Sequence, residues 1–510
     1  MQSSLTKRLR RALHVVAIVT MVIVAPATAA PPAPSVLTVD SILSKDALLH
    51  DVDILQQAYE ALHPGLHRYN TPAQMRGHFD ALRAEFDRDR TLGDAYLALS
   101  RFAATVKCGH TYANFYNQSK AVQRALFEGD DRVPFHFVWL GERMVVTRDF
   151  SGDPAMRPGT EVQSIDGVPA AELLARLMTI ARADGHNDAK RRALLAVRGD
   201  DAYETFDVFL PRVLPSRDGV RKYVVRAPGA TSTVPLRLQP STYAQRLATR
   251  EQATVGADEA QWTLDISDPT IAVLRMPGWA LYNSKWDWNA FLQQTFKTLT
   301  TSRKPALVID LRGNEGGIDV GDVVLGHLLD APRDFPSYQR LVRYRTAPST
   351  LLPYLDTWDP SFKDWGNDAQ PVDARYFRIG RWNSVQALRI TPQAPRYTGR
   401  VFVLVGATNS SATFEFARMA KASGAATLVG QPTGGNLRGI NGGAFFFLRL
   451  PKTGLEMDLP LVGQFPTRPQ PDAGVEPDIA VEPGIADVAA GRDVEMDAVR
   501  VAMGIRTDQD

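Results

Sequence analysis

The second half of the chain contains short, almost continuously apolar runs, and these constrain the fold more than any other feature. Residues 270–276 (TIAVLRM), 306–312 (ALVIDLR) and 401–405 (VFVLV) are such runs, and stretches with helical periodicity separate them. Strands that are apolar on both faces are typical of parallel sheets that helices cover on both sides. We therefore expect an α/β core over residues 255–485.

Helical periodicity dominates residues 41–125. Between residues 48 and 62, apolar side chains recur at spacings of three and four, which predicts one apolar face over four turns. A second helix is expected to begin after Thr71, with Gln74 closing a capping box, and a third near Thr91. These short amphipathic helices predict an N-terminal helical bundle.

Residues 130–240 show strand-like patterns instead. The runs FHFVWL and MVVT are joined across Gly141-Glu142, and residues 158–174 (PGTEVQSIDGVPAAELL) predict a strand, a turn at Asp166-Gly167 and a helix. This last segment resembles the heart of a PDZ-like module. We expect a small β-rich, PDZ-like domain here, and an unrelated β-rich insert is the alternative.

Two other segments have less regular patterns. Residues 334–395 are rich in Pro and Trp without a clear period, which predicts a lid, a specificity surface or a long irregular excursion. Residues 486–510 are expected to form a C-terminal tail.

The N-terminus has the pattern of a targeting segment. Four basic residues precede an apolar run over residues 12–24, and Ala27-Thr28-Ala29 is a small-x-small site of the kind that signal peptidase cleaves. The run of about thirteen residues is shorter than the roughly 20 that span a bilayer. We expect a signal peptide at residues 1–29, a periplasmic or secreted protein, and no stable membrane anchor after cleavage. An uncleaved anchor is the alternative.

The composition argues against several classes of function. Lys and Arg total 58 against 56 Asp and Glu, and no basic block follows the first dozen residues, so no nucleic-acid partner is expected. The nine histidines are dispersed without metal-ligand spacing, which predicts no metal and no cofactor. The single cysteine, Cys108, leaves no internal disulfide. The oligomeric state and the substrate specificity have no readable signal.

A first candidate turn spans residues 310–317 (DLRGNEGG), directly after a buried strand. In open α/β sheets, ligands and catalytic groups gather at the carboxyl ends of strands. Gly316 and Gly317 let successive backbone N–H groups turn inward, which suits binding of an oxyanion. The turn is not GxGxxG and no P-loop Lys follows, so a nucleotide site is disfavoured. A plain strand-to-helix turn is the alternative.

A second candidate turn spans residues 406–415 (GATNSSATFE). Ser411 is expected in the first turn of a helix at the mouth of the sheet, where the N–H of Ala412 lacks an intrahelical partner. A nucleophile beside an oxyanion donor is what acyl transfer needs. The alternative is that Ser410 or Ser411 only caps the helix.

The ordered motifs together resemble the tail-specific (carboxyl-terminal-processing) serine protease family, including its tricorn-core and interphotoreceptor-retinoid-binding-protein-like branches. LVIDLRGNEGG resembles the strand-loop motif of the family, and VFVLVGATNSSATFEFA resembles its strand and nucleophile elbow. TLVGQPTGGN and GVEPDI follow in the expected order, while ALHPGL and CGHTY resemble the helical part upstream. The resemblance implies a crotonase/ClpP-like α/β protease core and an endopeptidase that acts on polypeptides. Ser411 takes the nucleophile position, and the N–H of Ala412 with that of Gly316 or Gly317 would form the oxyanion hole.

The same resemblance directs attention to the general base. Asn436 stands where processing proteases carry a Lys, so a Ser-Lys dyad at that place is excluded. The branch that lacks this Lys relies on a His, and His110 in CGHT matches its position. Imidazole suits the role because its ordinary pKa of about 6.5 lies near working pH. A carboxylate would orient His110, with Asp472 and Glu476 as candidates that the sequence does not separate.

A further departure from the family pattern is Phe414, where most members have Glu, and Glu415 lies one position later. Phe414 and Asn436 favour a non-catalytic protein that binds a peptide or a lipid on the same fold. Ser411 and His110 favour the enzyme, and an esterase that uses the same site is a third hypothesis. Cys108 is disfavoured as a nucleophile because no helix-turn signature surrounds it.

Overall fold

The computed structural model describes residues 36–216, 218–250, 261–336, 338–380 and 388–505. The described residues from Leu37 onward cluster as one compact unit. The expected signal peptide, residues 1–29, lies outside the described residues. Within the described ranges, no helix combines the length and the apolar character needed to cross a membrane.

A six-stranded sheet in the order β22-β19-β18-β11-β10-β9 forms the centre of the α/β part. All its pairings are parallel except that of β9, which is antiparallel at the edge. Asp310, at the end of β11, lies opposite Leu404 of β18, so these two strands end at the same edge of the sheet. The strands are β9 (Thr263–Asp265), β10 (Ile271–Arg275), β11 (Ala306–Asp310), β18 (Arg400–Val405), β19 (Thr427–Gly430) and β22 (Ile479–Ala480).

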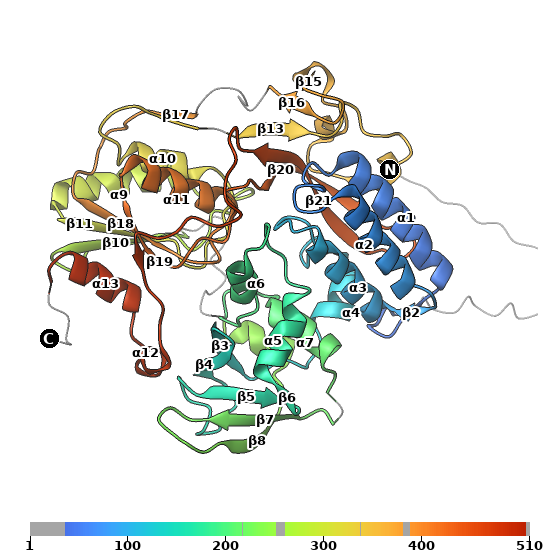
Figure 1. The fold of residues 1–510 in the computed structure, drawn as a ribbon. Coiled ribbons are helices and arrows are strands. Elements are labelled where there is room, and N and C mark those ends of the chain that lie inside the picture. Colours follow the sequence, from blue (N-terminus) through green and yellow to red (C-terminus); the bar gives the residue numbers. More distant parts are fainter. Residues whose placement is uncertain (1–35, 217, 251–260, 337, 381–387, 506–510) are drawn as a thin grey trace, which may run out of the picture. The chain divides into compact units, whose positions relative to one another are not determined.

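Helices cover both faces of this sheet (Figure 1). Leu307 and Ile309 pack with α9, α10 and α11, whereas Ala306 and Val308 pack on the other face with Val499 of α13. This alternation explains why the strand runs are apolar throughout, and it confirms the predicted α/β arrangement. The helices are α9 (Trp288–Ser302), α10 (Val320–Gly326), α11 (Ser411–Ser423), α12 (Ile485–Ala490) and α13 (Val494–Ala502).

The C-terminal segment differs from the tail that the sequence predicts. Residues 486–505 carry most of α12 and all of α13, and Val499 is completely buried against the sheet. The sequence alone does not reveal this role, because a nine-residue helix that buries one side chain leaves little apolar periodicity.

Four helices form the N-terminal part: α1 (Lys45–Leu62), α2 (Pro72–Glu85), α3 (Leu92–Thr105) and α4 (Lys120–Phe127). The expected capping box is confirmed, because Thr71 Oγ1 accepts from Gln74 N at 3.2 Å and Gln74 Oε1 accepts from Thr71 N at 2.8 Å. Thr91 caps α3 through a single bond, in which its Oγ1 accepts from Asp94 N at 3.0 Å. The short strands β1 (Ile42–Leu43) and β2 (Arg90–Thr91) pair beside these helices, and α4 was not predicted.

An antiparallel sheet in the order β3-β4-β5-β7-β8 follows, with β6 paired to β5. Asp166 and Gly167 have φ angles of 48° and 81°, as a type I′ hairpin turn requires, and α5 follows the turn as expected. The elements are β3 (Phe135–Leu140), β4 (Arg143–Asp149), β5 (Glu161–Ile165), β6 (Val168–Pro169), α5 (Ala170–Met178), α6 (Asp188–Leu194), α7 (Thr205–Val213), β7 (Arg221–Arg226), β8 (Val234–Leu238) and α8 (Tyr243–Ala248).

A second antiparallel sheet, of six strands in the order β14-β20-β21-β13-β16-β15, was not expected. Residues 334–395 supply four of its strands, and residues 441–465 supply the hairpin β20-β21. Its apolar side chains belong to the same hydrophobic cluster as those of the N-terminal helices, so residues 255–485 do not share one core, contrary to the prediction. The strands are β13 (Gln339–Val342), β14 (Leu355–Asp356), β15 (Ala369–Pro371), β16 (Phe377–Ile379), β20 (Asn441–Arg449) and β21 (Glu456–Phe465), and β12 (Arg333–Phe335) pairs separately with β17 (Leu388–Ile390).

The ion pair between Asp207 and Arg246 is buried, with both side chains 1% exposed and Arg246 Nε 2.8 Å from Asp207 Oδ2. Removing one partner of such a pair leaves an uncompensated buried charge, which costs about 3–5 kcal/mol. Asp207→Ala should therefore accelerate hydrogen exchange in α7 and α8 and lower the free energy of unfolding by about that amount. Asp53→Ala, which removes the exposed partner of Arg83, should cost less than about 1 kcal/mol. If both variants lost the same free energy of unfolding, the larger cost expected for the buried ion pair would be contradicted.

Candidate active site

The loop between β18 and α11 (residues 406–411, the elbow) turns sharply into the helix. Ser411 begins α11 with a φ of 51°, in the left-handed region that residues other than glycine rarely adopt. Such strain costs about 1–3 kcal/mol and persists only where the surroundings hold it. Asn409 provides that hold: its Oδ1 accepts from Gly406 N at 2.7 Å, and its Nδ2 donates to the carbonyls of Leu311 and Asn314 at 2.6 and 2.9 Å. The elbow is thereby fastened to residues 311–317, the glycine loop.

The two adjacent serines of the elbow differ in their partners. Ser410 is 6% exposed, and its Oγ donates to Glu315 O at 3.1 Å and lies 3.3 Å from Lys190 Nζ, which donates to it. Its side chain does not cap α11. Ser411 is half-buried, and no described residue hydrogen-bonds its hydroxyl. The capping alternative is therefore wrong, and Ser411 carries the hydroxyl that is free to react.

Gly316 lies directly against the elbow. A Cβ built on it would be 2.9 Å from Ser411 Cβ and 2.9 Å from Ala412 N, so the close approach of the two loops requires glycine here. Its N–H donates to Asn314 Oδ1 at 2.9 Å. Gly316 therefore sets the distance between the two loops. Because its N–H already donates to Asn314, this N–H is not free to bind an oxyanion.

Gly317 and Ala412 have N–H groups that donate to no acceptor among the described residues. Gly317 has a φ of 145°, and a Cβ added to it would be 2.0 Å from Trp279 O, so no other residue fits. Ala412 is the second residue of α11 and lacks an intrahelical acceptor. Of the three N–H groups that the sequence singles out, those of Gly317 and Ala412 are free to bind an oxyanion.

His110 lies in the loop after α3 (residues 106–112, the histidine loop). No described residue hydrogen-bonds its Nδ1, its ring centre is 5.9 Å from that of Phe445, and a Cβ added to Gly442 would be 4.0 Å from its Nε2. Burial lowers the pKa of His110 from its ordinary 6.5, although the charge of Asp184 acts in the opposite direction. The imidazole is therefore neutral near pH 7, as a general base must be. His110 and Ser411 do not hydrogen-bond each other in the described structure.

The upstream motif ALHPGL contacts the histidine loop, which itself contains the motif CGHTY. His63, from ALHPGL, accepts from Gly65 N through Nδ1 at 3.1 Å, so its Nε2 donates to Thr111 Oγ1 at 2.8 Å. Burial lowers the pKa of His63 to about 3, and the ring stays neutral. Asn441, at the start of β20, donates to Cys108 Sγ at 3.2 Å. His63 is thus a structural residue of this loop.

Neither of the two candidate carboxylates orients His110. Asp472 Oδ2 is 2.6 Å from Nδ1 of His186, and its Oδ1 accepts from Asn436 Nδ2 at 2.7 Å. Glu476 does not hydrogen-bond His110 in the described structure either. Asn436, which the sequence resemblance aligns with a Lys of processing proteases, is therefore part of a hydrogen-bonded pair with Asp472.

Phe414, the other departure from the family pattern, is completely buried. A Cβ added to Gly435 would be 2.3 Å from its ring, so Phe414 fills the space under residues 433–436. Glu415 forms an ion pair with Arg418 at 2.8 Å. The aromatic ring therefore supports a loop at the position where most family members have a carboxylate.

Residues 182–190, which run from the loop after α5 into α6, supply charged side chains that sequence reasoning missed. Arg182 donates to Gly109 O at 2.9 Å and to Glu315 Oε2 at 3.1 Å, and Asp184 Oδ1 accepts from Gly109 N at 3.0 Å. Lys190 Nζ is 2.9 Å from the same Oε2 of Glu315. The segment thus contacts the histidine loop and the glycine loop together. In the sequence these residues look like a solvated charged surface, and no local pattern distinguishes them.

The charges of this cluster act on one another. Burial acts to raise the pKa of Glu315, but the charges of Lys190 and Arg182 outweigh it and lower that pKa to about 2. The charges of Arg182, Lys190 and Glu315 also act on the pKa of His110. His110 is therefore within electrostatic reach of the groups that hold the glycine loop and the elbow.

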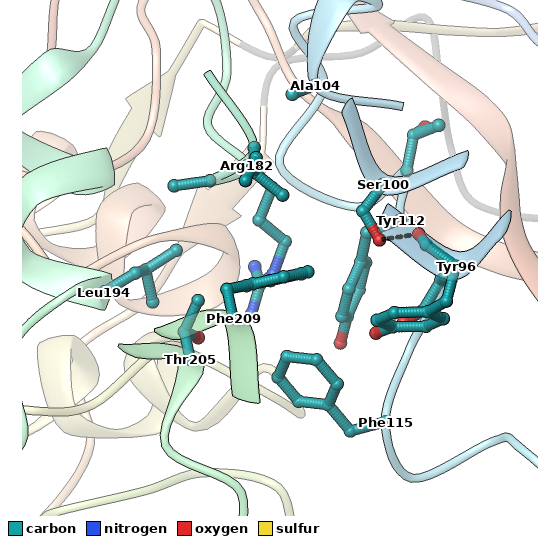
Figure 2. A pocket seen from close by; sticks show the side chains of 13 residues that line it. Tyr96, Ser100, Ala104, Tyr112, Phe115, Arg182, Leu194, Thr205 and Phe209 are labelled. Carbon is teal, nitrogen blue, oxygen red and sulfur yellow. Dashed lines mark hydrogen bonds between the residues drawn. The ribbon is translucent and has the colours of Figure 1, made fainter. Parts of the chain in front are cut away.

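A small cavity adjoins Arg182, between α3, α6 and α7 (Figure 2). Arg182 and Tyr112 both line the cavity, and the guanidinium carbon of Arg182 lies 4.3 Å from the ring centre of Tyr112. The cavity volume of about 20 Å³ is enough for about one water molecule, so the cavity is a packing feature. Within the described ranges, no group of three or more His, Cys, Asp or Glu side chains could hold a metal ion.

Comparison with known proteins gives one family match and several similar folds. Residues 270–481 match the model of peptidase family S41. The structure is similar to that of mature CPAF complexed with lactacystin, with a TM-score of 0.60 and 14% identity over 90% of this chain and 98% of that chain. A second structure of mature CPAF gives a TM-score of 0.58 and 15% identity over 91% and 99% of the two chains. The photosystem II D1 C-terminal processing protease gives a TM-score of 0.37 and 16% identity over 88% and 98%. No curated protein matches the chain in sequence.

Cys108 is buried, and burial raises the pKa of its thiol to about 11. Because the thiolate is the reactive form, the native chain should not react with Ellman's reagent at pH 8. After denaturation in guanidinium, the one cysteine of each chain should react fully. Rapid reaction of the native chain would show an accessible thiolate and would restore Cys108 as a candidate nucleophile.

Proposed function

Because residues 270–481 match the model of peptidase family S41, we propose that the chain is an exported serine endopeptidase that cleaves polypeptides with Ser411 as nucleophile and His110 as general base. One observation carries the proposal: the strained Ser411 has a free hydroxyl beside the free N–H of Ala412, with the glycine loop packed against both. The family match and the CPAF-like fold support a serine peptidase. The periplasm or the exterior as its location rests on the sequence pattern of residues 1–29.

The proposed chemistry proceeds through an acyl-enzyme. His110 takes the proton of Ser411 Oγ as this oxygen attacks the carbonyl carbon of the scissile peptide bond. The N–H groups of Gly317 and Ala412 bind the oxyanion, and the tetrahedral intermediate collapses as His110 gives its proton to the leaving amine. Water, deprotonated by His110, then releases the acyl group and restores the Ser411 hydroxyl.

Approach of His110 to Ser411 is part of this proposal. Catalytic hydrogen bonds are often long in structures without substrate and shorten in the complex. The unpartnered Nδ1 of His110 supports this assignment, since no competing bond has to break before the ring moves. With His110 as base, the proposal places the chain in the Lys-lacking branch of the family. It includes a crotonase/ClpP-like core and a PDZ-like β-rich domain, both of which rest on the sequence resemblance.

A fluorophosphonate probe tests the nucleophile. Wild-type protein should be labelled, Ser411→Ala should lose the label, and peptide mapping should place the adduct on Ser411. Ser423→Ala, at the other end of α11, is the matched control and should be labelled like the wild type. A folded wild type that takes no label would favour the non-catalytic binding protein. Turnover of esters but not of peptides would favour the esterase.

The acid limb of the pH profile tests the base. Because burial lowers the pKa of His110, its neutral form persists as the pH falls below 6.5. The ratio kcat/KM for a peptide substrate should stay constant from pH 8 to about 6.5 and decline at lower pH, with a slope of one proton. His110→Asn should lower kcat/KM by about 10²–10⁴-fold, the usual contribution of a general base. An acid limb above pH 7.5 would contradict this assignment.

A further inference from the structure

Lys190, on α6, is a buried cation with all of its hydrogen-bonding capacity in use. Its side chain is 1% exposed. Its Nζ lies 2.9 Å from Glu315 Oε2, 2.8 Å from Thr408 O and 3.3 Å from Ser410 Oγ. An ammonium group has three N–H donors, and three acceptors surround it here. Burial lowers the pKa of Lys190 from its ordinary 10.5, while the charge of Glu315 acts to raise it. A neutral amine would place its lone pair toward one of these acceptors, so the geometry fits the charged form.

These three acceptors belong to the two loops that carry the free N–H groups. Glu315 stands two residues before Gly317 in the glycine loop. Thr408 and Ser410 stand just before Ser411 and Ala412 in the elbow. Ser410 Oγ also donates to Glu315 O at 3.1 Å, which closes a ring of contacts between the loops. One ammonium group therefore spans both sides of the proposed oxyanion hole.

The surroundings of Lys190 make this bridge rigid. Arg182 holds the same carboxylate oxygen of Glu315 from a second direction at 3.1 Å. The Lys190 side chain is 1% exposed, and a buried charge is tolerated only when it is paired and hydrogen-bonded, so Lys190 cannot turn away from Glu315 without a large cost. The backbone of the elbow is fixed through Thr408 O as well, so the bridge does not depend on a mobile side chain alone.

We propose that Lys190 is a positioning residue that sets the distance between the Gly317 and Ala412 N–H groups by bridging Glu315 to the elbow. The proposal rests on the proposed function, because these two N–H groups act together only in acyl transfer. Lys190 does not serve as the base: its three N–H groups are directed to acceptors, and its neighbour in the elbow is Ser410. It supplies a lysine to this site from a different element than the family's lysine position, which Asn436 occupies here.

Lys190→Met tests the bridge, because it keeps the length of the side chain and removes the charge. Oxyanion donors act mainly in the transition state, so kcat should fall by about 10²-fold while KM changes little. Binding of a peptide boronate, which mimics the tetrahedral state, should weaken by a similar factor, whereas binding of a cleaved product peptide should not. The acid limb of kcat/KM should keep its position, since a positioning residue scales the rate without changing the base.

Two further variants make the result decisive. Lys421→Met removes another lysine–carboxylate pair, that with Asp478 at 3.0 Å, from the same helix as Ser411, and should leave kcat unchanged. Glu315→Gln keeps the shape of the glycine loop and removes its charge, so it should lower kcat in the same direction and serves if Lys190→Met fails to fold. A folded Lys190→Met or Glu315→Gln with wild-type kcat would overturn the proposal.

The proposed function and the bridge can fail separately. If wild-type protein is labelled on Ser411 and cleaves peptides while the Lys190 and Glu315 variants keep full kcat, the bridge is wrong and the peptidase stands. If Lys190→Met abolishes the acid limb of the pH profile, Lys190 is the base and the positioning role is wrong. If the folded wild type neither takes the label nor hydrolyses peptides, both proposals are overturned.

Discussion

Parallel pairing of β11 with β18 is the constraint on which the candidate site depends. In a parallel pair both strands end at the same edge, and neighbouring strands lie about 4.8 Å apart. Because Asp310 is opposite Leu404, the glycine loop and the elbow begin side by side. Asn409 then joins their backbones, and the contact of Gly316 with Ser411 and Ala412 follows from that closeness. The sheet therefore accounts for the meeting of the Ser411 hydroxyl with the N–H groups of Gly317 and Ala412, although β11 and β18 are far apart in sequence.

Burial of charge between these loops has a structural consequence. An isolated ammonium group at the buried position of Lys190 would be costly, so Lys190 is tolerated there because it is paired with Glu315, which Arg182 also contacts. The two cations come from the segment that follows α5, and the anion comes from the α/β part. The geometry of the glycine loop is thus coupled to the presence of a segment more than a hundred residues upstream. The same segment contacts the histidine loop through Gly109, so one stretch of chain touches three parts of the site.

Features with a local physical origin could be predicted from the sequence. The strand at residues 306–310, the capping box at Thr71, the I′ turn at Asp166-Gly167 and the start of α11 at Ser411 all follow from short-range patterns. The second antiparallel sheet could not be predicted in the same way. Its strands β13 to β16 have four residues or fewer, too short for a period-two pattern, and they gain their stability by pairing with β21 or β20 or with one another.

The candidate site also contains residues that could be predicted from local sequence and residues that could not. Ser411, Ala412 and the glycine pair could be located from the sequence, because a strand, a turn and a helix start determine where a hydroxyl and unpaired N–H groups emerge. The carboxylate near His110 could not, because Asp184 reaches the histidine loop across 75 residues, whereas Asp472 is engaged by His186 and Asn436.

By itself, then, the sequence determined the α/β arrangement and the position of the elbow with Ser411 as candidate nucleophile, because apolar periodicity and turn chemistry act over a few residues. His110 became the candidate base only through the resemblance to the protease family. Only the tertiary structure decided that the N–H of Gly316 donates to Asn314 while the N–H of Gly317 stays free. It also decided that Lys190 lies between the glycine loop and the elbow. Those outcomes depend on which hydrogen-bond donor reaches which acceptor after the loops have packed. The local sequence pattern does not contain this information, because the donors and acceptors come from segments far apart in the chain.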